Sequence, residues 1–159
     1  MTDNGAHAGA VVVFGYADGL SWLHGTAMTL TTAYVCVLIA ALLPYLWVAV
    51  SKASGERYDN RDPRRWQEKQ QSPRSQRAYA AQLNSYEAFA PFAAGVVLAQ
   101  LAGVAHSQIA TLSLAFVALR VLHGVVYIAG RHYLRSLAWA LGFACVIGLL
   151  VQAALHIAP

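Results

Sequence analysis

The sequence predicts an all-α membrane protein, a single domain over residues 1–159 built as a four-transmembrane-helix bundle. Of the 159 residues, 58% are hydrophobic and only 11% are charged, about half of the roughly 25% charged share that is usual in soluble domains. Four apolar stretches each exceed the roughly 20 residues that cross a hydrocarbon core. The basic residues cluster in one loop instead of spreading along a surface. A large multidomain enzyme is therefore excluded, and nucleic acid is not an expected partner.

The first predicted span covers residues 22–50, within a charge-free run that ends before Lys52. Ahead of it, MTDNGAHAGA lacks the basic segment of a secretory signal, so we expect a frayed leader there. After the span comes a polar loop at residues 51–74. The loop contains Asp62 before Pro63 and Ser72 before Pro73, and both pairs are typical helix-start signals.

The second and third predicted spans, residues 75–102 and 107–130, share a long apolar stretch, and between Ala78 and Arg120 Glu87 is its only charge. This stretch is too long for a single helix, and the weakly polar LAGVAHSQ supplies a turn. The fourth predicted span, residues 136–157, follows Arg135 and carries no charge. The sequence therefore predicts four spans.

The basic residues predict the orientation of the bundle. Both the long loop and the connection around Arg131 and Arg135 are basic, and basic connections face the cytoplasm. Both chain termini are therefore expected on the non-cytoplasmic side. Eight of the eleven basic residues lie in or directly after the long loop: Lys52, Arg57, Arg61, Arg64, Arg65, Lys69, Arg74 and Arg77.

On two of the spans, polar residues share one helix face, together with Pro91 on the second span, within an arc of roughly 80° at 100° per residue. Such residues are costly in a bilayer and need partners. A buried ion pair between Glu87 and Arg120 explains part of this pattern, but two polar stripes at matching depth favour a site for an anionic ligand. The stripes consist of Arg77, Asn84, Glu87 and Pro91 on the second span, and of Arg120, His123, Tyr127 and Arg131 on the third.

Several chemistries are not expected from the sequence. Cys36 and Cys145 stand alone inside apolar runs, where a thiol packs as a small hydrophobic group. Of the six histidines only His123 is well placed within a span, so no haem and no metal site is expected. Nucleophile and phosphate-loop motifs are absent from the sequence. Any reaction would then use the nucleophile of a substrate, such as a thiolate stabilised by a basic pocket.

Two motifs resemble those of a known membrane protein group. RAYAAQLNSYEAFAPF, residues 77–92, and RVLHGVVYIAGRHYLRSLAW, residues 120–139, resemble the MAPEG superfamily, membrane-associated proteins in eicosanoid and glutathione metabolism. YDNRDPRRW in the loop resembles a bacterial branch of it. The resemblance implies a homotrimer of four-helix subunits in the bacterial inner membrane, with glutathione bound between subunits near the cytoplasmic side.

The resemblance also implies roles for individual residues. Arg135 resembles the arginine that stabilises the glutathione thiolate, which makes it the expected catalytic residue. One departure is Ala80, where the enzymes of the superfamily carry an arginine, and another is His123, which replaces a tyrosine of the leukotriene-forming enzyme. The expected binding residues are Arg77, Gln82, Asn84, Glu87, Arg120, His123 and Tyr127.

These features leave three functions to compare. The first is a glutathione transferase-like or peroxidase-like protein that uses glutathione as co-substrate against a hydrophobic electrophile from the lipid. The alternative is a non-catalytic binder of a lipid or another amphipathic anion, which Ala80 favours. A proton-coupled transporter using Glu87 is disfavoured, because Arg77 and Arg120 surround that carboxylate. The expected partners are further copies of the chain, membrane lipids and a hydrophobic small molecule.

Overall fold

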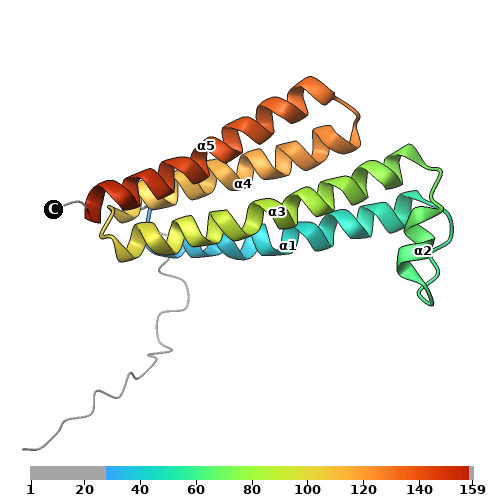
Figure 1. Cartoon of the computed structure of the whole chain (residues 1–159), viewed down its shortest axis with the longest axis horizontal. Coiled ribbons are helices and arrows are strands. Elements are labelled where there is room, and N and C mark those ends of the chain that lie inside the picture. The colour runs from blue at the N-terminus through green and yellow to red at the C-terminus, as the bar shows by residue number, and fades with distance from the viewer. Residues whose placement is uncertain (1–27, 158–159) are drawn as a thin grey trace, which may run out of the picture.

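The computed structural model describes residues 28–157, and its regular structure over this range is entirely helical. Four long helices lie side by side, with one short helix in the first connection (Figure 1). Helix α1 packs against α3 and α4, while α5 packs against α4 and α3. The helices are α1 (Leu30–Ser54), α2 (Pro63–Glu68), α3 (Pro73–Leu101), α4 (His106–Ile128) and α5 (His132–Ile157).

The four long helices lie where the sequence predicts spans. Predicted residues 22–27 and the leader lie outside the described residues, and α1 continues a few residues beyond the predicted end, to Ser54. The start of α1, the α3–α4 turn and the end of α5 lie at one end of the bundle in Figure 1. The connection with α2 and the α4–α5 turn lie at the other end. The two basic connections therefore share one end, as the sequence predicts.

Both helix-start signals of the long loop begin a helix. The Asp62 carboxylate accepts a hydrogen bond from the backbone N–H of Arg65 at 3.1 Å, with Pro63 as the first residue of α2. The Ser72 hydroxyl caps α3 in the same way, accepting from the N–H of Ser75. Pro fits the first position of a helix because its missing N–H would have no helical partner there. The connection is therefore partly helical rather than a simple solvated loop.

The other two turns each need a glycine. Gly103 after α3 has a φ of 79°, and Gly130 after α4 has a φ of 74°. This left-handed region is strained for residues with a Cβ atom. Each glycine lets the backbone turn sharply, and α4 and α5 therefore follow one another as a tight hairpin.

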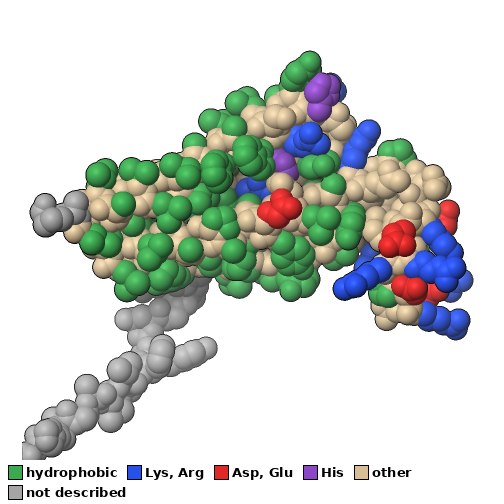
Figure 2. All heavy atoms as spheres, in the orientation of Figure 1, with side chains coloured by type: hydrophobic (Ala, Val, Ile, Leu, Met, Phe, Trp, Pro, Cys, Tyr) green, Lys and Arg blue, Asp and Glu red, His purple; other side chains and the backbone are tan. Residues whose placement is uncertain are grey.

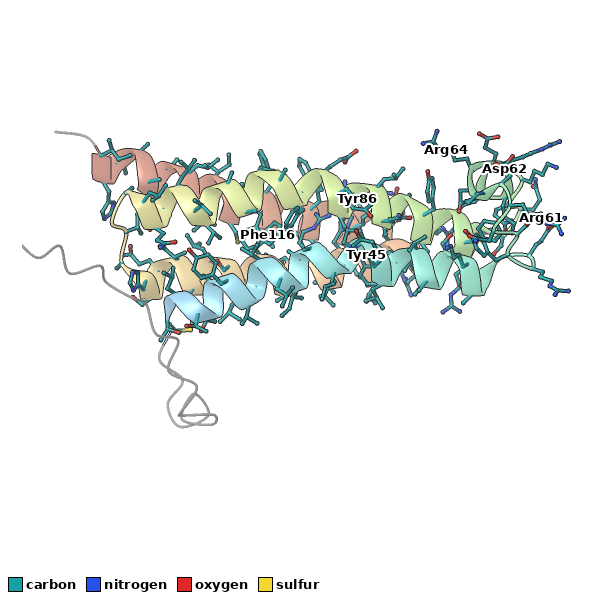
Figure 3. All side chains as sticks on the ribbon, turned by 90° about the horizontal axis from the view of Figure 1, so that it is seen from below. Tyr45, Arg61, Asp62, Arg64, Tyr86 and Phe116 are labelled. Carbon is teal, nitrogen blue, oxygen red and sulfur yellow. The ribbon has the colours of Figure 1, made fainter. Side chains whose placement is uncertain are left out.

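The core is made of small and aromatic side chains from all four long helices. The rings of Phe92 and Phe116 stack with centroids 3.9 Å apart, and Phe116 lies between the helices in Figure 3. Trp47 of α1 packs directly on the backbone of Gly124, where a Cβ atom would lie under 3.0 Å from three ring carbons. Cys36 is buried among these groups, as the sequence predicts for a packing role. This close approach fixes how α1 and α4 face each other.

The outside of the bundle is apolar. Leu38, Leu101 and Leu137 are 58%, 76% and 57% exposed, and hydrophobic side chains cover most of the body in Figure 2, with charges gathered toward the α2 end. Soluble proteins avoid a continuous apolar surface that covers most of the molecule. By length and composition α1, α4 and α5 are each able to cross a membrane. The described part of the chain is thus an integral membrane protein.

Candidate functional site

Three adjoining hollows form a continuous groove along α3, α4 and α5. The outer hollow has a volume of about 190 Å³, the middle one about 280 Å³ and the inner one about 150 Å³. The outer and middle hollows share Tyr127 and Arg135, and the middle and inner hollows share Asn84 and Trp139. The α4–α5 pair diverges from α1 and α3 toward the α2 end (Figure 1), and the outer hollow is lined by residues around the α4–α5 turn at that end.

The outer hollow is basic. Arg77 of α3 reaches the α4–α5 turn, where its guanidinium occupies the space that a side chain at Gly130 would need. Arg131, His132 and Arg135 line the same hollow. Basic side chains from two elements therefore meet at the mouth of the groove, which suits an anionic group.

The middle hollow centres on Tyr127 and Arg135. The guanidinium carbon of Arg135 lies 4.4 Å from the centroid of the Tyr127 ring, within the range of a cation–π contact. The ring of His123 meets the same tyrosine edge-on, with centroids 5.5 Å apart. Tyr127 therefore holds Arg135 over the groove while leaving its planar donor groups free for a ligand.

The junction of the middle and inner hollows is a polar network across α3 and α4. Arg120 is buried, and its Nη2 donates to the side-chain Oδ1 of Asn84 at 2.6 Å and to the backbone carbonyl of Asn84 at 3.0 Å. The amide of Asn84 donates in turn to Glu87 at 3.2 Å. Within the described residues Arg120 is thus tied to Glu87 through Asn84 rather than in a direct ion pair. Arg120 fixes Asn84, and Asn84 orients the carboxylate.

Two buried polar atoms in this region lack a partner in the described structure, Nε of Arg120 and Nδ1 of His123. His123 is only 2% exposed and lines the middle hollow. Buried polar atoms are normally hydrogen-bonded, and exceptions mark places where a ligand or water binds. The sequence interpretation of His123 as a ligand-facing residue is compatible with this position.

The inner hollow is mostly apolar. Phe116, Phe143 and Val146 form much of its wall, and the rings of Trp139 and Phe143 stack with centroids 5.4 Å apart. Pro91 contributes from α3 and cannot donate to the carbonyl one turn before it, which is that of Glu87. The groove therefore changes along its length from basic at the mouth to apolar at the inner end.

Seven of the eight predicted site residues line this groove: Arg77, Asn84, Glu87, Arg120, His123, Tyr127 and Arg135. Gln82 does not. It lines a separate hollow between α1, α2 and α3. Gln82 is two residues before Asn84, and residues two apart on a helix point in directions about 200° apart. The functional roles of the seven stay predictions.

The sequence interpretation missed the contribution of α5 beyond Arg135. Ser136, Trp139 and Phe143 line the groove from this helix. Arg135, Trp139 and Phe143 are spaced four residues apart, which places them on one helix face. This spacing was the feature of the sequence that could have predicted the contribution of α5 to the groove. Within residues 28–157 no group of three His, Cys, Asp or Glu side chains is placed to hold a metal ion.

A helical bundle with an apolar exterior and a polar groove at the depth of its spans defines an integral membrane protein with an internal polar site. The particular family is shown by comparison of the sequence. Residues 32–155 match the model of the MAPEG family, and the chain belongs to that family. No curated protein and no solved structure matches the chain.

Proposed function

We propose that the protein is a membrane glutathione transferase or peroxidase of the MAPEG type. The observation that carries this proposal is the continuous groove, in which Arg135 stands between a basic outer hollow and an apolar inner one. Glutathione is an anionic peptide with a thiol, and its carboxylates suit Arg77 and Arg131 at the mouth. The alternative, a non-catalytic binder of an amphipathic anion, is an outcome of the test below.

In the proposed reaction the fixed charge of Arg135 favours the thiolate form of the bound thiol. The sulfur then attacks a hydrophobic electrophile held against Trp139 and Phe143. In a transfer reaction a carbon–sulfur bond forms and the leaving group takes the electron pair. With a hydroperoxide the thiolate takes the distal oxygen and releases an alkoxide, and a second thiol reduces the resulting sulfenic acid to a disulfide with loss of water.

We further propose that the chain forms a homotrimer and that α3 crosses the membrane as a fourth span beside α1, α4 and α5. Glu87 lies at the middle of α3 and is exposed, and a carboxylate facing hydrocarbon is costly. A neighbouring subunit and a ligand in the groove would cover it. Helix α3 is long enough to cross the membrane, although its polar side chains reduce its mean hydropathy below that of the other long helices.

The bacterial inner membrane, with both basic connections in the cytoplasm, is the location that we propose. It places the mouth of the groove near the cytoplasmic surface, where glutathione is available to Arg135 and Arg131. The apolar inner hollow then lies deeper, where a hydrophobic substrate enters from the lipid.

The test is calorimetry and ultraviolet thiolate spectroscopy with glutathione on the full chain in detergent. Wild type should bind glutathione and show a thiolate signal. Arg135→Lys should keep the thermal stability but reduce the signal and the transfer to a model electrophile, because lysine lacks the planar donor fork. Arg74→Lys, at an exposed arginine of α3 outside the groove, is the matched control.

Two results would overturn the catalytic proposal. One is a fully active Arg135→Lys protein, which would make Arg135 a simple interfacial anchor. The other is the absence of a thiolate signal at saturating glutathione. Binding of a fatty-acid anion together with no binding of glutathione would replace the proposal by the non-catalytic binder.

A further inference from the structure

A second polar hollow lies outside the groove, in the corner between α1, α2 and α3. Its volume is about 200 Å³, and we call it the corner hollow. It adjoins a larger hollow of about 340 Å³, with which it shares Arg64, Gln67 and Tyr79. None of the residues that line the groove line the corner hollow. Its principal lining residues are Lys52, Tyr58, Arg64, Trp66, Tyr79 and Gln82.

The corner hollow is built by a well-fixed loop. The indole N–H of Trp66 donates to the carbonyl of Arg57 at 3.0 Å, and Trp66 is only 9% exposed. Gln70 is buried, accepts from the N–H of Glu56 at 3.0 Å and donates to the carbonyl of Trp66 at 3.1 Å. The Ser51 hydroxyl of α1 donates to the Gln67 side chain at 3.2 Å, and the Gln76 amide of α3 donates to the carbonyl of Gln70 at 2.6 Å. Because these bonds hold α2 and the residues after it against α1 and α3, the hollow is preformed, which reduces the entropy cost of binding.

The charge of the corner hollow is positive. Lys52 comes from the last turns of α1 and Arg64 from the first turn of α2, and no carboxylate lines the hollow. The ammonium of Lys52 lies 3.9 Å from the centroid of the Tyr58 ring, so an aromatic face positions it without neutralising it. The only acid that lines either of the two hollows is Glu68, which belongs to the adjoining hollow. Two cations from separate elements therefore face one space.

Gln82 offers a further polar group. Its side-chain Oε1 is buried and has no hydrogen-bond partner in the described structure. Oxygen and nitrogen of an amide are assigned from such partners, so in either orientation Gln82 leaves a donor or an acceptor unused. Gln82 therefore brings an unpaired polar group to the wall of the corner hollow, and this gives a predicted site residue outside the groove a place in a second hollow.

The depth of the corner hollow selects the type of ligand. Val48 lies one turn before Lys52 on α1, inside a helix that is able to span a membrane, and both line the hollow. Arg64 and Trp66 lie beyond the end of that helix, in the loop. The hollow therefore extends from hydrocarbon to headgroup level, and Trp and Tyr favour this interface. Figure 3 shows Arg64 on the side of the loop nearer the bundle and Arg61 farther out.

We propose that the corner hollow binds the headgroup of an anionic phospholipid, with its phosphate between Lys52 and Arg64 and an acyl chain along Val48. Positive charge from two elements recognises the phosphate. The apolar wall distinguishes a lipid from a free phosphate, which gains nothing from it. Gln82 is placed to bond a headgroup hydroxyl. The site is independent of glutathione and of the groove.

The experiment is a lipid titration of the full chain in mild detergent, read as retained lipid by native mass spectrometry. The probes are phosphatidylglycerol, phosphatidylcholine and inorganic phosphate in excess. Phosphatidylglycerol should bind with preference over phosphatidylcholine, whose choline is repelled by the two cations. Arg64→Gln and Lys52→Gln should each weaken phosphatidylglycerol binding about fivefold, as expected for one interfacial cation.

Arg61→Gln is the matched control, since Arg61 is an exposed arginine of the same loop that lines neither hollow. It should change lipid binding less than twofold, and all three variants should keep the unfolding temperature of lipid-free wild type. Equal weakening by Arg61→Gln would show diffuse attraction and overturn the site. Equal retention of phosphatidylcholine would also overturn it, as would complete displacement of the lipid by inorganic phosphate.

Discussion

Replacing Asn84 by Leu is expected to destabilise the fold more than replacing Arg120 by Met, although Arg120 carries the charge. Arg120 is 3% exposed. Both hydrogen bonds that its guanidinium donates are accepted by Asn84, one by the side-chain oxygen and one by the backbone carbonyl. Asn84→Leu removes the side-chain acceptor and leaves the guanidinium buried with the backbone carbonyl alone. Losing one hydrogen bond to a charged group costs about 1.5–3 kcal/mol.

Arg120→Met removes the charge itself. The aliphatic stem of Arg120 packs near Gly142, where a Cβ atom would lie 3.7 Å from Cδ, and the unbranched Met side chain replaces this stem. The lost hydrogen bonds are offset by the removal of a buried charge and of the unpaired Nε. A buried guanidinium without a direct ion pair carries a desolvation cost of several kcal/mol that its removal relieves, so we expect a net change within about 1 kcal/mol.

The assay is reversible unfolding in mixed micelles, with the free energy of unfolding measured for wild type, both single variants and the double variant. The double variant should be more stable than Asn84→Leu alone, with a coupling energy of at least about 1 kcal/mol. Additive effects would show that the two residues do not act as a unit. An Arg120→Met loss equal to or above that of Asn84→Leu would refute the reasoning, because the buried charge would then be a net source of stability.

Three further predictions concern packing, assembly and topology. Gly124→Ala should lower the free energy of unfolding by about 1–3 kcal/mol in the same assay, because its Cβ meets the Trp47 ring, whereas Gly148→Ala, with 3.5 Å to its nearest neighbour, should have little effect. Native mass spectrometry in mild detergent should show a homotrimer, and a predominant monomer or dimer would contradict the assembly. A reporter that fluoresces only in the cytoplasm should stay dark when fused after Pro159, and a bright signal would reverse the orientation.

Apolar length and local signals predicted most of the fold. The four long helices follow from runs of apolar residues, and two helix starts follow from Asp62–Pro63 and Ser72–Pro73, because capping depends on neighbouring residues only. The two polar stripes also follow from the helical period, which is the same in any tertiary setting. Helix α2 was predicted only as a start signal, since six residues are too few to form an apolar pattern.

The tertiary structure decided which residues meet. Rotation of each helix about its axis is set by interhelical packing, such as Trp47 against Gly124, and no local pattern encodes it. This packing links Arg120 to Asn84 rather than directly to Glu87, whereas the position of Gln82 outside the groove already follows from the helical period. It also brings the aromatic face of α5 opposite the polar face of α3. The sequence by itself determined the helices and their polar faces, and the contacts between helices determined the groove.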